Sequence, residues 1–218
     1  MGQERDLLRH FPRRSASRSL RGIVTEEDRR ISRQFGFHYF DGERQHGYGG
    51  YSYHPRFWSR VAVDIRDTYQ LRPDASILDV GCAKGFLLHD LAELMPQSTL
   101  VGVDISEYAL TNSKPHERVS IARANAHSLP FADNSFDLVL SINTVHNLSR
   151  ELCVQAMSEM QRVSSANAFA MVDGWRTEIE KKALEDWILT AETVLSADGW
   201  VELFDEAGYT GDFGFWTL

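Results

Sequence analysis

Residues 77–86, ILDVGCAKGF, are the part of the sequence whose residue types and spacing suggest chemistry most directly. An apolar run reaches Asp79, and Gly81 and Gly85 then follow with three residues between them. Glycine lets the backbone approach a ligand closely and adopt positive φ angles. The next apolar run ends in an acid, Asp104, which lies 23 residues after Gly81. This arrangement predicts a cofactor-binding turn with a carboxylate beside it.

Two common nucleotide-binding patterns do not fit this turn. The dinucleotide fingerprint G-x-G-x-x-G requires glycine where Ala83 and Phe86 stand. The phosphate-binding pattern G-x-x-x-x-G-K-[ST] is absent from the sequence. The observed spacing, D-x-G-x-x-x-G, therefore points to a cofactor other than a dinucleotide or a nucleoside triphosphate.

Short apolar runs alternate with helical patterns from residue 76 onward. This alternation predicts a parallel sheet with right-handed crossovers and helices on both faces. We expect strands at residues 76–81, 99–106, 118–126, 135–148, 167–175 and 211–218, and helices at 84–95, 108–115, 150–163, 177–196 and 199–208. Ligands bind beyond the carboxyl ends of the strands in such sheets, and the glycine turn follows the first strand.

The chain before this alternation divides into two parts. Residues 1–24 include an arginine-rich stretch and predict a flexible basic arm. Residues 25–72 predict two helices, at 25–37 and 54–71, around a loop rich in Gly, Tyr and His. We expect this second part to be an aromatic lid or substrate segment over a cofactor-binding domain at 73–218.

Charge is distributed unevenly along the 218 residues, whose net charge is −8. The first 33 residues hold nine Arg against five acidic residues, and the remainder holds fourteen basic and twenty-six acidic residues. An acidic body argues against a nucleic-acid surface and favours a small-molecule substrate, although the arginine-rich arm leaves an acidic partner possible in principle.

The composition also indicates location and excludes several site types. No apolar run approaches the roughly 18 residues of a membrane span, and the first residues lack the apolar core of a signal peptide. We therefore expect a cytoplasmic protein without membrane contact. The two cysteines are too few for a disulfide framework, and His38, His46 and His54 have no metal-site spacing, so we expect no metal.

Four segments together resemble the class I S-adenosylmethionine-dependent methyltransferases of the small-molecule type. They are ILDVGCAKG, VGVDIS, LPFADNSFDLVLSINTVHNL and FDEAGYTG, and the resemblance covers roughly residues 55–216. It implies an α/β, three-layer Rossmann-like sandwich with a mostly parallel sheet and an antiparallel last strand. Only GDFGFWTL remains at the end of the chain. The seventh strand of the family would then be missing, supplied by a partner chain or located elsewhere in the sequence.

The resemblance also implies which residues bind S-adenosylmethionine and its product S-adenosylhomocysteine. Asp104 would accept the ribose hydroxyls, Ile105 would pack on the adenine, and Asp79 would support the methionyl amino group. The full set of candidates comprises Asp79, Gly81, Cys82, Gly85, Asp104, Ile105, Asn125, Ala126, Asn143 and Tyr48. This sequence departs from the family at Ala83, which replaces the middle glycine, and at Asn125, which replaces an acid that reads the adenine amino group.

Methyl transfer from a sulfonium is an in-line displacement, for which the protein mainly holds the nucleophile close to the methyl group. The candidates for catalysis are His146, Asn143 and Tyr51. His146 has a reference pKa suited to a general base, but a loop histidine can equally cap the following helix. Asn143 could line the pocket or stabilise a turn. The segment GYGGYSYHP, with Tyr48 and Tyr51, could close over the cofactor or be pinned against the core.

These observations lead to one functional prediction and two alternatives. We expect methyl transfer to an N or O atom of a small molecule, such as a biosynthetic metabolite or a saccharide, by an enzyme that could form a homodimer. The first alternative is a methyltransferase of macromolecules that uses the basic arm. The second is a cofactor-binding interaction module without catalysis.

Overall fold

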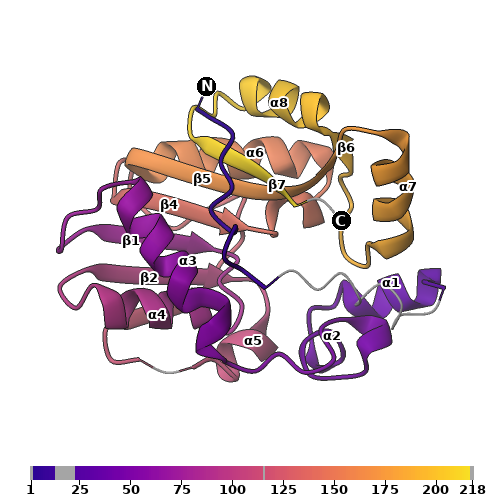
Figure 1. Cartoon of the computed structure of the whole chain (residues 1–218), viewed down its shortest axis with the longest axis horizontal. Helices are drawn as coiled ribbons and strands as arrows, with labels where there is room; N and C mark the ends of the chain where they lie inside the picture. The colour runs from indigo at the N-terminus through magenta and orange to yellow at the C-terminus, as the bar shows by residue number, and fades with distance from the viewer. Residues whose placement is uncertain (1, 13–22, 115, 217–218) are drawn as a thin grey trace.

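A computed structural model describes residues 2–12, 23–114 and 116–216 of the chain, and its centre is a seven-stranded sheet (Figure 1). The strand order is β3-β2-β1-β4-β5-β6, and β7 also pairs with β5. All the pairings between these strands are parallel. The strands are β1 (Ser76–Val80), β2 (Thr99–Asp104), β3 (Val119–Arg123), β4 (Phe136–Ile142), β5 (Ser164–Trp175), β6 (Leu195–Ser196) and β7 (Asp212–Trp216).

Helices cover both faces of the sheet, which confirms the predicted three-layer α/β sandwich. One face packs against α3 (Pro55–Thr68) and α4 (Phe86–Leu94), and the other against α6 (Arg150–Val163) and α8 (Ala197–Glu206). Alternate residues of β5 serve the two cores, since Phe169 and Met171 join the first and Ala170 and Val172 the second. The shorter helices α5 (Glu107–Thr111) and α7 (Glu178–Trp187) follow β2 and β5.

The last strand differs from the sequence prediction. β7 runs parallel to β5, from Phe169 beside Asp212 to Asp173 beside Trp216, so the expected antiparallel last strand is wrong. The start of the chain lies along the other side of β7, as the indigo segment in Figure 1 shows. Its backbone bonds to β7 twice, from Arg5 N to Phe213 O at 2.7 Å and from Phe213 N to Gln3 O at 3.1 Å.

The prediction of a flexible arm over residues 1–24 is consequently wrong for residues 2–12. Besides the contacts with β7, Leu7 and Leu8 are buried in the core that α3 and α4 share. Burying two leucines favours order in this segment by several kcal/mol, at about 2 kcal/mol for each side chain. The arginine-rich part of the predicted arm, residues 13–22, lies outside the described residues.

The predicted helix at 177–196 is also too long. The helix α7 ends at Trp187, and Thr190, Ala191 and Thr193 are buried in the loop that follows. Two amides of this loop bond to a carbonyl elsewhere in the chain, as described below, so tertiary contacts replace the helical bonds there. The loop then forms the short strand β6, which the sequence analysis did not predict.

Residues 25–54, which we call the cap segment, form three short helices beyond the carboxyl ends of the strands (Figure 1). They are α1 (Glu26–Ser32), α2 (Phe37–Phe40) and the 3₁₀ turn η2 (Arg44–His46). The structure thus shortens the predicted helix at 25–37 and finds helical turns in the predicted loop.

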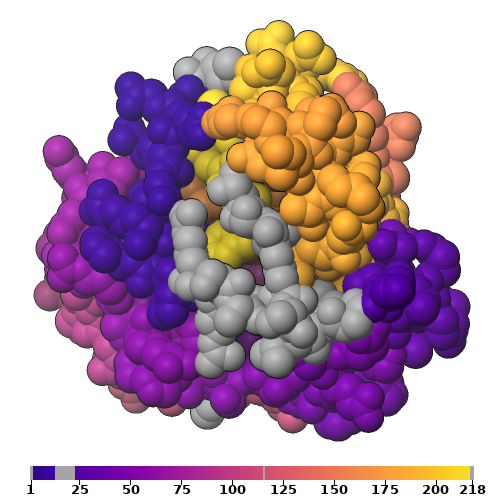
Figure 2. Space-filling model, turned by 45° about the vertical axis from the view of Figure 1, so that its right-hand side comes forward, coloured from indigo at the N-terminus to yellow at the C-terminus, as the bar shows by residue number. Residues whose placement is uncertain are grey.

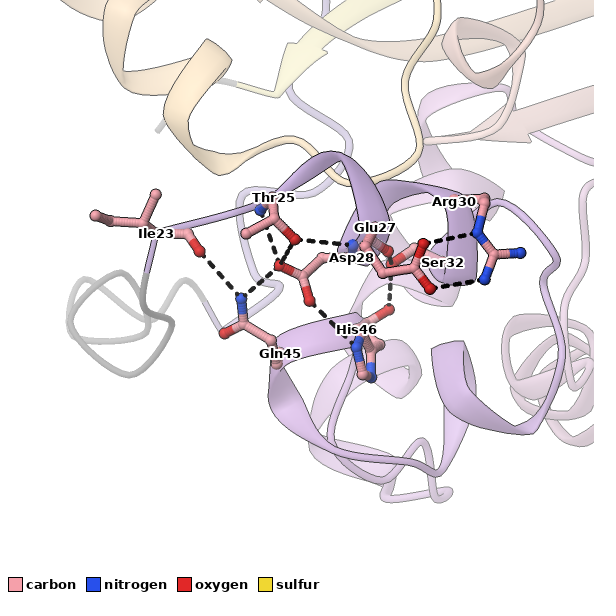
Figure 3. Close-up of polar contacts among 8 residues, drawn as sticks. All are labelled: Ile23, Thr25, Glu27, Asp28, Arg30, Ser32, Gln45 and His46. Atoms are coloured by element: carbon pink, nitrogen blue, oxygen red, sulfur yellow. Dashed lines mark hydrogen bonds and ion pairs between the residues drawn. The ribbon is translucent and has the colours of Figure 1, made fainter.

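Figure 3 shows that Asp28 ties these pieces together. Its carboxylate accepts bonds from Thr25 N at 2.8 Å and Gln45 Nε2 at 3.0 Å, and it lies 3.2 Å from His46 Nε2. Hydrogen bonds from Thr25 and Gln45 lower the pKa of Asp28 to about 2. The capping box of α1 therefore also fixes η2, and the cap segment is held as one unit.

Candidate functional site

The glycine turn after β1 has the geometry that a cofactor cradle requires. Gly81 has φ +85°, and a Cβ there would lie 2.0 Å from Thr144 Oγ1. Gly85, the N-cap of α4, has φ +71°, and a Cβ there would meet no atom within 4 Å. The first glycine thus allows close packing of two loops, while the second faces open space. Ala83, where the family has glycine, also takes a positive φ of 48°.

Asp104 at the end of β2 faces this turn. Its carboxylate accepts hydrogen bonds from Ala83 N and Ser106 N, each at 2.8 Å. Burial raises the pKa of Asp104 despite these bonds. The following residue, Ile105, is 42% exposed, which is unusual for a large apolar side chain next to a buried strand. A flat apolar ligand would cover it.

Asp79 in β1 is a second carboxylate at the same edge of the sheet. It is only 5% exposed, and no group among the described residues donates a hydrogen bond to its side chain. Burial, followed by repulsion from Asp104, raises the pKa of Asp79 to about 7. Two carboxylates close enough to repel each other, in a buried place, favour a positively charged ligand.

Three other predicted cofactor residues fall into different environments. Asn125 follows β3 and is exposed, so its side chain can reach a ligand. Ala126 is half-buried and packs against the core of α6 and α8. Cys82 is buried, and a Cβ on Gly102 would lie 2.7 Å from its sulfur. Burial raises the pKa of the Cys82 thiol, so this cysteine packs behind the turn rather than acting as a nucleophile.

The tyrosines of the cap segment lie over the cradle. The rings of Tyr48 and Tyr51 are 4.4 Å apart, and Tyr51 stacks on Phe86 of α4 at 4.9 Å. Burial, and then the negative charge of Asp79, raise the pKa of the Tyr51 hydroxyl. The structure thus brings Tyr51 and Tyr48 near the two acids, with Tyr51 packed on Phe86 and Tyr48 42% exposed, and their role as a lid stays a prediction.

A cluster around Asp41 fastens the cap segment to the cradle. The Asp41 carboxylate accepts bonds from Lys84 Nζ at 2.5 Å, Tyr108 Oη at 2.7 Å and the backbone N of Tyr51 at 2.9 Å. Lys84 also donates to the Tyr51 carbonyl at 2.8 Å. Lys84 lies between Ala83 and Gly85 in the glycine turn, and Asp41 lies in the cap segment. The ion pair between them therefore links the turn to the cap segment.

The loop after β4 positions His146, which lies in the 3₁₀ turn η3 (Val145–Asn147). Its Nδ1 accepts a hydrogen bond from the backbone N of Asp173 at 2.9 Å, and its Nε2 lies 3.6 Å from Asp173 Oδ2. The carbonyl of His146 accepts bonds from Glu192 N and Thr193 N, each at 3.0 Å. His146 as a general base stays a prediction, but its Nδ1 lone pair is already in use.

Asn143 stands between β4 and η3 with φ +55°. Its backbone N donates to Met171 O at 2.9 Å, which places it beside the end of β5. Among the described residues, its buried side-chain Oδ1 and that of Asn147 have no hydrogen-bond donor, and Nε1 of the half-buried Trp175 has no acceptor. Buried polar atoms without partners in a native structure call for an explanation, and a bound ligand would provide one.

The predicted site residues thus gather near the carboxyl ends of the strands. On the side of the molecule that Figure 2 brings forward, a hollow has the C-terminal part of the chain (yellow) at its floor, between α7 and the start of the chain. A depression at the opposite edge of the sheet involves Tyr69 and Asp212 but none of the predicted site residues. The sequence analysis missed Asp41, Lys84 and Asp173. Only Asp173 had a sequence signal, since an acid near the end of a predicted strand falls on the ligand edge.

Comparison with known proteins is consistent with this geometry. Residues 77–167 match the family described as methyltransferase domain. A demethylmenaquinone methyltransferase of Symbiobacterium thermophilum is 36% identical over 49% of this chain and 45% of its own length. A tRNA (carboxymethyluridine(34)-5-O)-methyltransferase of Arabidopsis thaliana is 31% identical over 64% of this chain and 32% of its own length. The chain therefore spans less than half the length of either relative.

The solved structures show the same fold. The YcgJ protein of Bacillus subtilis superposes with a TM-score of 0.54 and 20% identity, covering 67% of this chain and 66% of that protein. Among the described residues, no helix is both long and apolar enough to cross a membrane.

Proposed function

We propose that this chain is a class I methyltransferase, as the family match of residues 77–167 supports, and that it transfers a methyl group from S-adenosylmethionine to an N or O atom of a small molecule. The observation that carries the proposal is the pair of buried carboxylates, Asp79 and Asp104. Among the described residues no cation faces Asp79, and the nearby Lys84 is paired with Asp41. S-adenosylmethionine carries an ammonium, a sulfonium and a carboxylate, so its net positive charge would offset part of the charge of these two acids.

The residues around the turn fit this cofactor. The Asp104 carboxylate is positioned by two backbone amides and would accept the ribose hydroxyls. Exposed Ile105 would pack on the adenine, and Asn125 would accept a bond from its amino group. Asp79 would hold the methionyl ammonium. The open space at Gly85 leaves room for the ligand beside the first turn of α4.

The bound cofactor supplies an electrophilic methyl group on a positively charged sulfur. The chain's own residues then have three tasks: to bind the acceptor, to align its nucleophilic atom with the methyl group, and to exclude water. Tyr48 and Tyr51 cover the acids from the cap side, and Asn143 and Trp175 offer buried polar atoms without partners at the other side. Alignment rather than a protein nucleophile accounts for the catalysis we propose.

The small-molecule acceptor is supported by the acidic body of the chain and by the cap segment, which covers the edge where the acceptor must bind. The demethylmenaquinone relative acts on a small molecule according to its name. The tRNA methyltransferase relative favours the second candidate, a macromolecular acceptor bound by the arginine-rich residues 13–22.

Two measurements test the proposal. Calorimetric titration with S-adenosylmethionine and S-adenosylhomocysteine should show binding of both, and absence of binding would overturn the proposal. Turnover should then be sought with small-molecule and RNA panels, using the wild type and a variant with Arg13, Arg14, Arg18 and Arg21 replaced by Gln. This variant leaves the packed residues 2–12 intact. If the wild type methylates a substrate and the variant does not, the macromolecular acceptor is favoured.

A further inference from the structure

A carboxylate without a hydrogen-bond donor lies near the carboxyl end of β5. Asp173 has 13% of its side chain exposed, so its oxygens can be reached from outside the chain. Among the described residues no group donates a hydrogen bond to these oxygens, since His146 Nε2 at 3.6 Å is too distant. The backbone of Asp173 is nevertheless fixed, because its N donates to His146 Nδ1 and its O accepts from Trp200 Nε1 at 2.8 Å.

The hydrogen bond to His146 determines which way the imidazole faces. Because Nδ1 accepts the amide proton of Asp173, the neutral ring carries its own proton on Nε2. That N–H lies on the side of Asp173 Oδ2 and leaves Oδ1 without a partner. In this tautomer His146 has no free lone pair with which to accept a proton from a substrate. The group beside His146 that can accept one is the Asp173 carboxylate.

The charge count at this edge indicates what kind of partner the carboxylate takes. Asp79 in β1, Asp104 in β2 and Asp173 in β5 all stand at or near the carboxyl ends of parallel strands, and β4 lies between β1 and β5. Among the described residues no lysine or arginine is paired with any of these acids, and in the proposed binding mode the ammonium of S-adenosylmethionine is taken by Asp79. A further cation at Asp173 would improve the balance, whereas a neutral or anionic acceptor would leave a nearly buried charge without a partner.

We propose that Asp173 binds the acceptor as an ammonium ion and takes up its proton, and that His146 positions Asp173. The acceptor class is thus a primary or secondary amine, an assignment that rests on the proposed function and deepens it. Burial raises the pKa of the Asp173 carboxyl, which helps it hold that proton.

The step balances without any further reactant. The proton moves from the ammonium nitrogen to an Asp173 oxygen, and the freed lone pair of the nitrogen forms the new N–C bond. The C–S bond breaks with its electron pair going to sulfur, so that the sulfonium becomes the thioether of S-adenosylhomocysteine. The product leaves as a methylated ammonium ion, and Asp173 returns its proton to water.

Matched pairs of probes test this assignment before the acceptor is known. Ethylamine and ethanol, cyclohexylamine and cyclohexanol, and 2-phenylethylamine and 2-phenylethanol would be titrated into the complex with S-adenosylhomocysteine by ligand-observed NMR. We expect at least one amine to bind about tenfold more tightly than its alcohol, as a charge-assisted bond requires. The preference should vanish in Asp173→Asn, or in Asp173→Ser if the first variant does not fold.

The control is Glu192→Gln, which removes an exposed acid from the loop that bonds to His146 and should keep the amine preference. His146→Ala should reduce the preference, and His146→Asn, whose side-chain oxygen can accept from the Asp173 amide, should restore part of it, while both retain affinity for S-adenosylhomocysteine. Equal binding of amines and alcohols, no binding of any amine, or a preference that persists without Asp173 would overturn the assignment. If S-adenosylhomocysteine itself fails to bind the wild type, the proposed function fails instead.

Discussion

Replacing Asp79 with Asn tests the reasoning about unbalanced charge without any knowledge of the acceptor. Burial and Asp104 raise the pKa of Asp79 to about 7, from an ordinary value of about 3.9. The folded state therefore takes up a proton that the unfolded chain releases. The stability associated with this proton is fully present below pH about 4 and is lost as the pH rises through about 7. A difference of about three pKa units corresponds to a loss of about 4 kcal/mol above that range.

The Asp79→Asn variant cannot ionise at this position and should escape this loss. Urea unfolding of the ligand-free protein should show it more stable than the wild type by about 2–4 kcal/mol at pH 8.5, with no such gain at pH 4. Its affinity for S-adenosylmethionine should fall about tenfold or more, because the ammonium loses a charged partner. The same substitution thus stabilises the empty protein and weakens the complex.

Asp137→Asn serves as a control of opposite sign. A hydrogen bond from the backbone N of Ser76, at 2.8 Å, is the main cause that lowers the pKa of Asp137. Its contribution to stability is present at neutral pH and is lost as the pH falls below the ordinary carboxyl range. This variant should therefore be less stable than the wild type at pH 7 and equal to it at pH 2. If Asp137→Asn gives these results but Asp79→Asn is no more stable than the wild type at pH 8.5, the argument for an uncompensated carboxylate at Asp79 is refuted.

Three further predictions test the cradle and its cap. Asp104→Ala should weaken binding of S-adenosylmethionine by about 1.5–3 kcal/mol in calorimetry, because the charged bonds to the ribose are lost; unchanged affinity would contradict the assignment of Asp104. Ala83→Gly should raise the free energy of unfolding by about 1 kcal/mol, since Ala83 has a φ of +48°, and a decrease would show that the turn is unstrained. Asp41→Asn should cost about 2–4 kcal/mol in urea unfolding, because Lys84 would keep a buried charge without its partner. Lys84→Met in the same background should recover part of that loss, and independent, additive effects of the two substitutions would argue against the pairing.

The sequence was sufficient to predict the parts of the fold that depend on local patterns. The alternation of strands and helices from Ser76 to Val163 follows from apolar spacing, which reports burial directly. The glycine turn could be predicted for the same reason, since Gly81 and Asp104 lie at strand ends and Gly85 is the N-cap of α4, while its role as a cofactor cradle stays a prediction. In these strands, helices and turns, the residues that local conformation favours are also the residues that the packed structure needs.

The misses have a common physical cause, namely contacts between residues far apart in the chain. Leu7 and Leu8 give no periodic pattern of their own, yet burial against α3 and α4 orders them. The sequence after Trp187 continues the helical pattern. In the structure, however, two amides of this segment donate to the carbonyl of His146 and the helix does not continue. The partners of Asp41 come from 43 and 67 residues further along the chain, a pairing that no local pattern encodes.

The same non-local contacts make the cap segment and the cradle one thermodynamic unit. Lys84 lies inside the glycine turn and Asp41 inside the cap, and Ser106 Oγ, which caps α5 beside Asp104, donates to the Phe35 carbonyl at 2.5 Å. On the other side, Arg33 of the cap donates to the Ala191 carbonyl in the loop that binds His146.

A ligand in the cradle and an acceptor at Asp173 therefore both act on the same segment, from opposite ends. Any cofactor that shifts the glycine turn must move or strain the bond between Lys84 and Asp41, and any change at His146 reaches the cap through the loop after α7. By linkage, binding at one end changes affinity at the other to the same degree. The family match at residues 77–167 does not include the cap segment, and acceptor choice and cofactor affinity should vary together when this segment is altered.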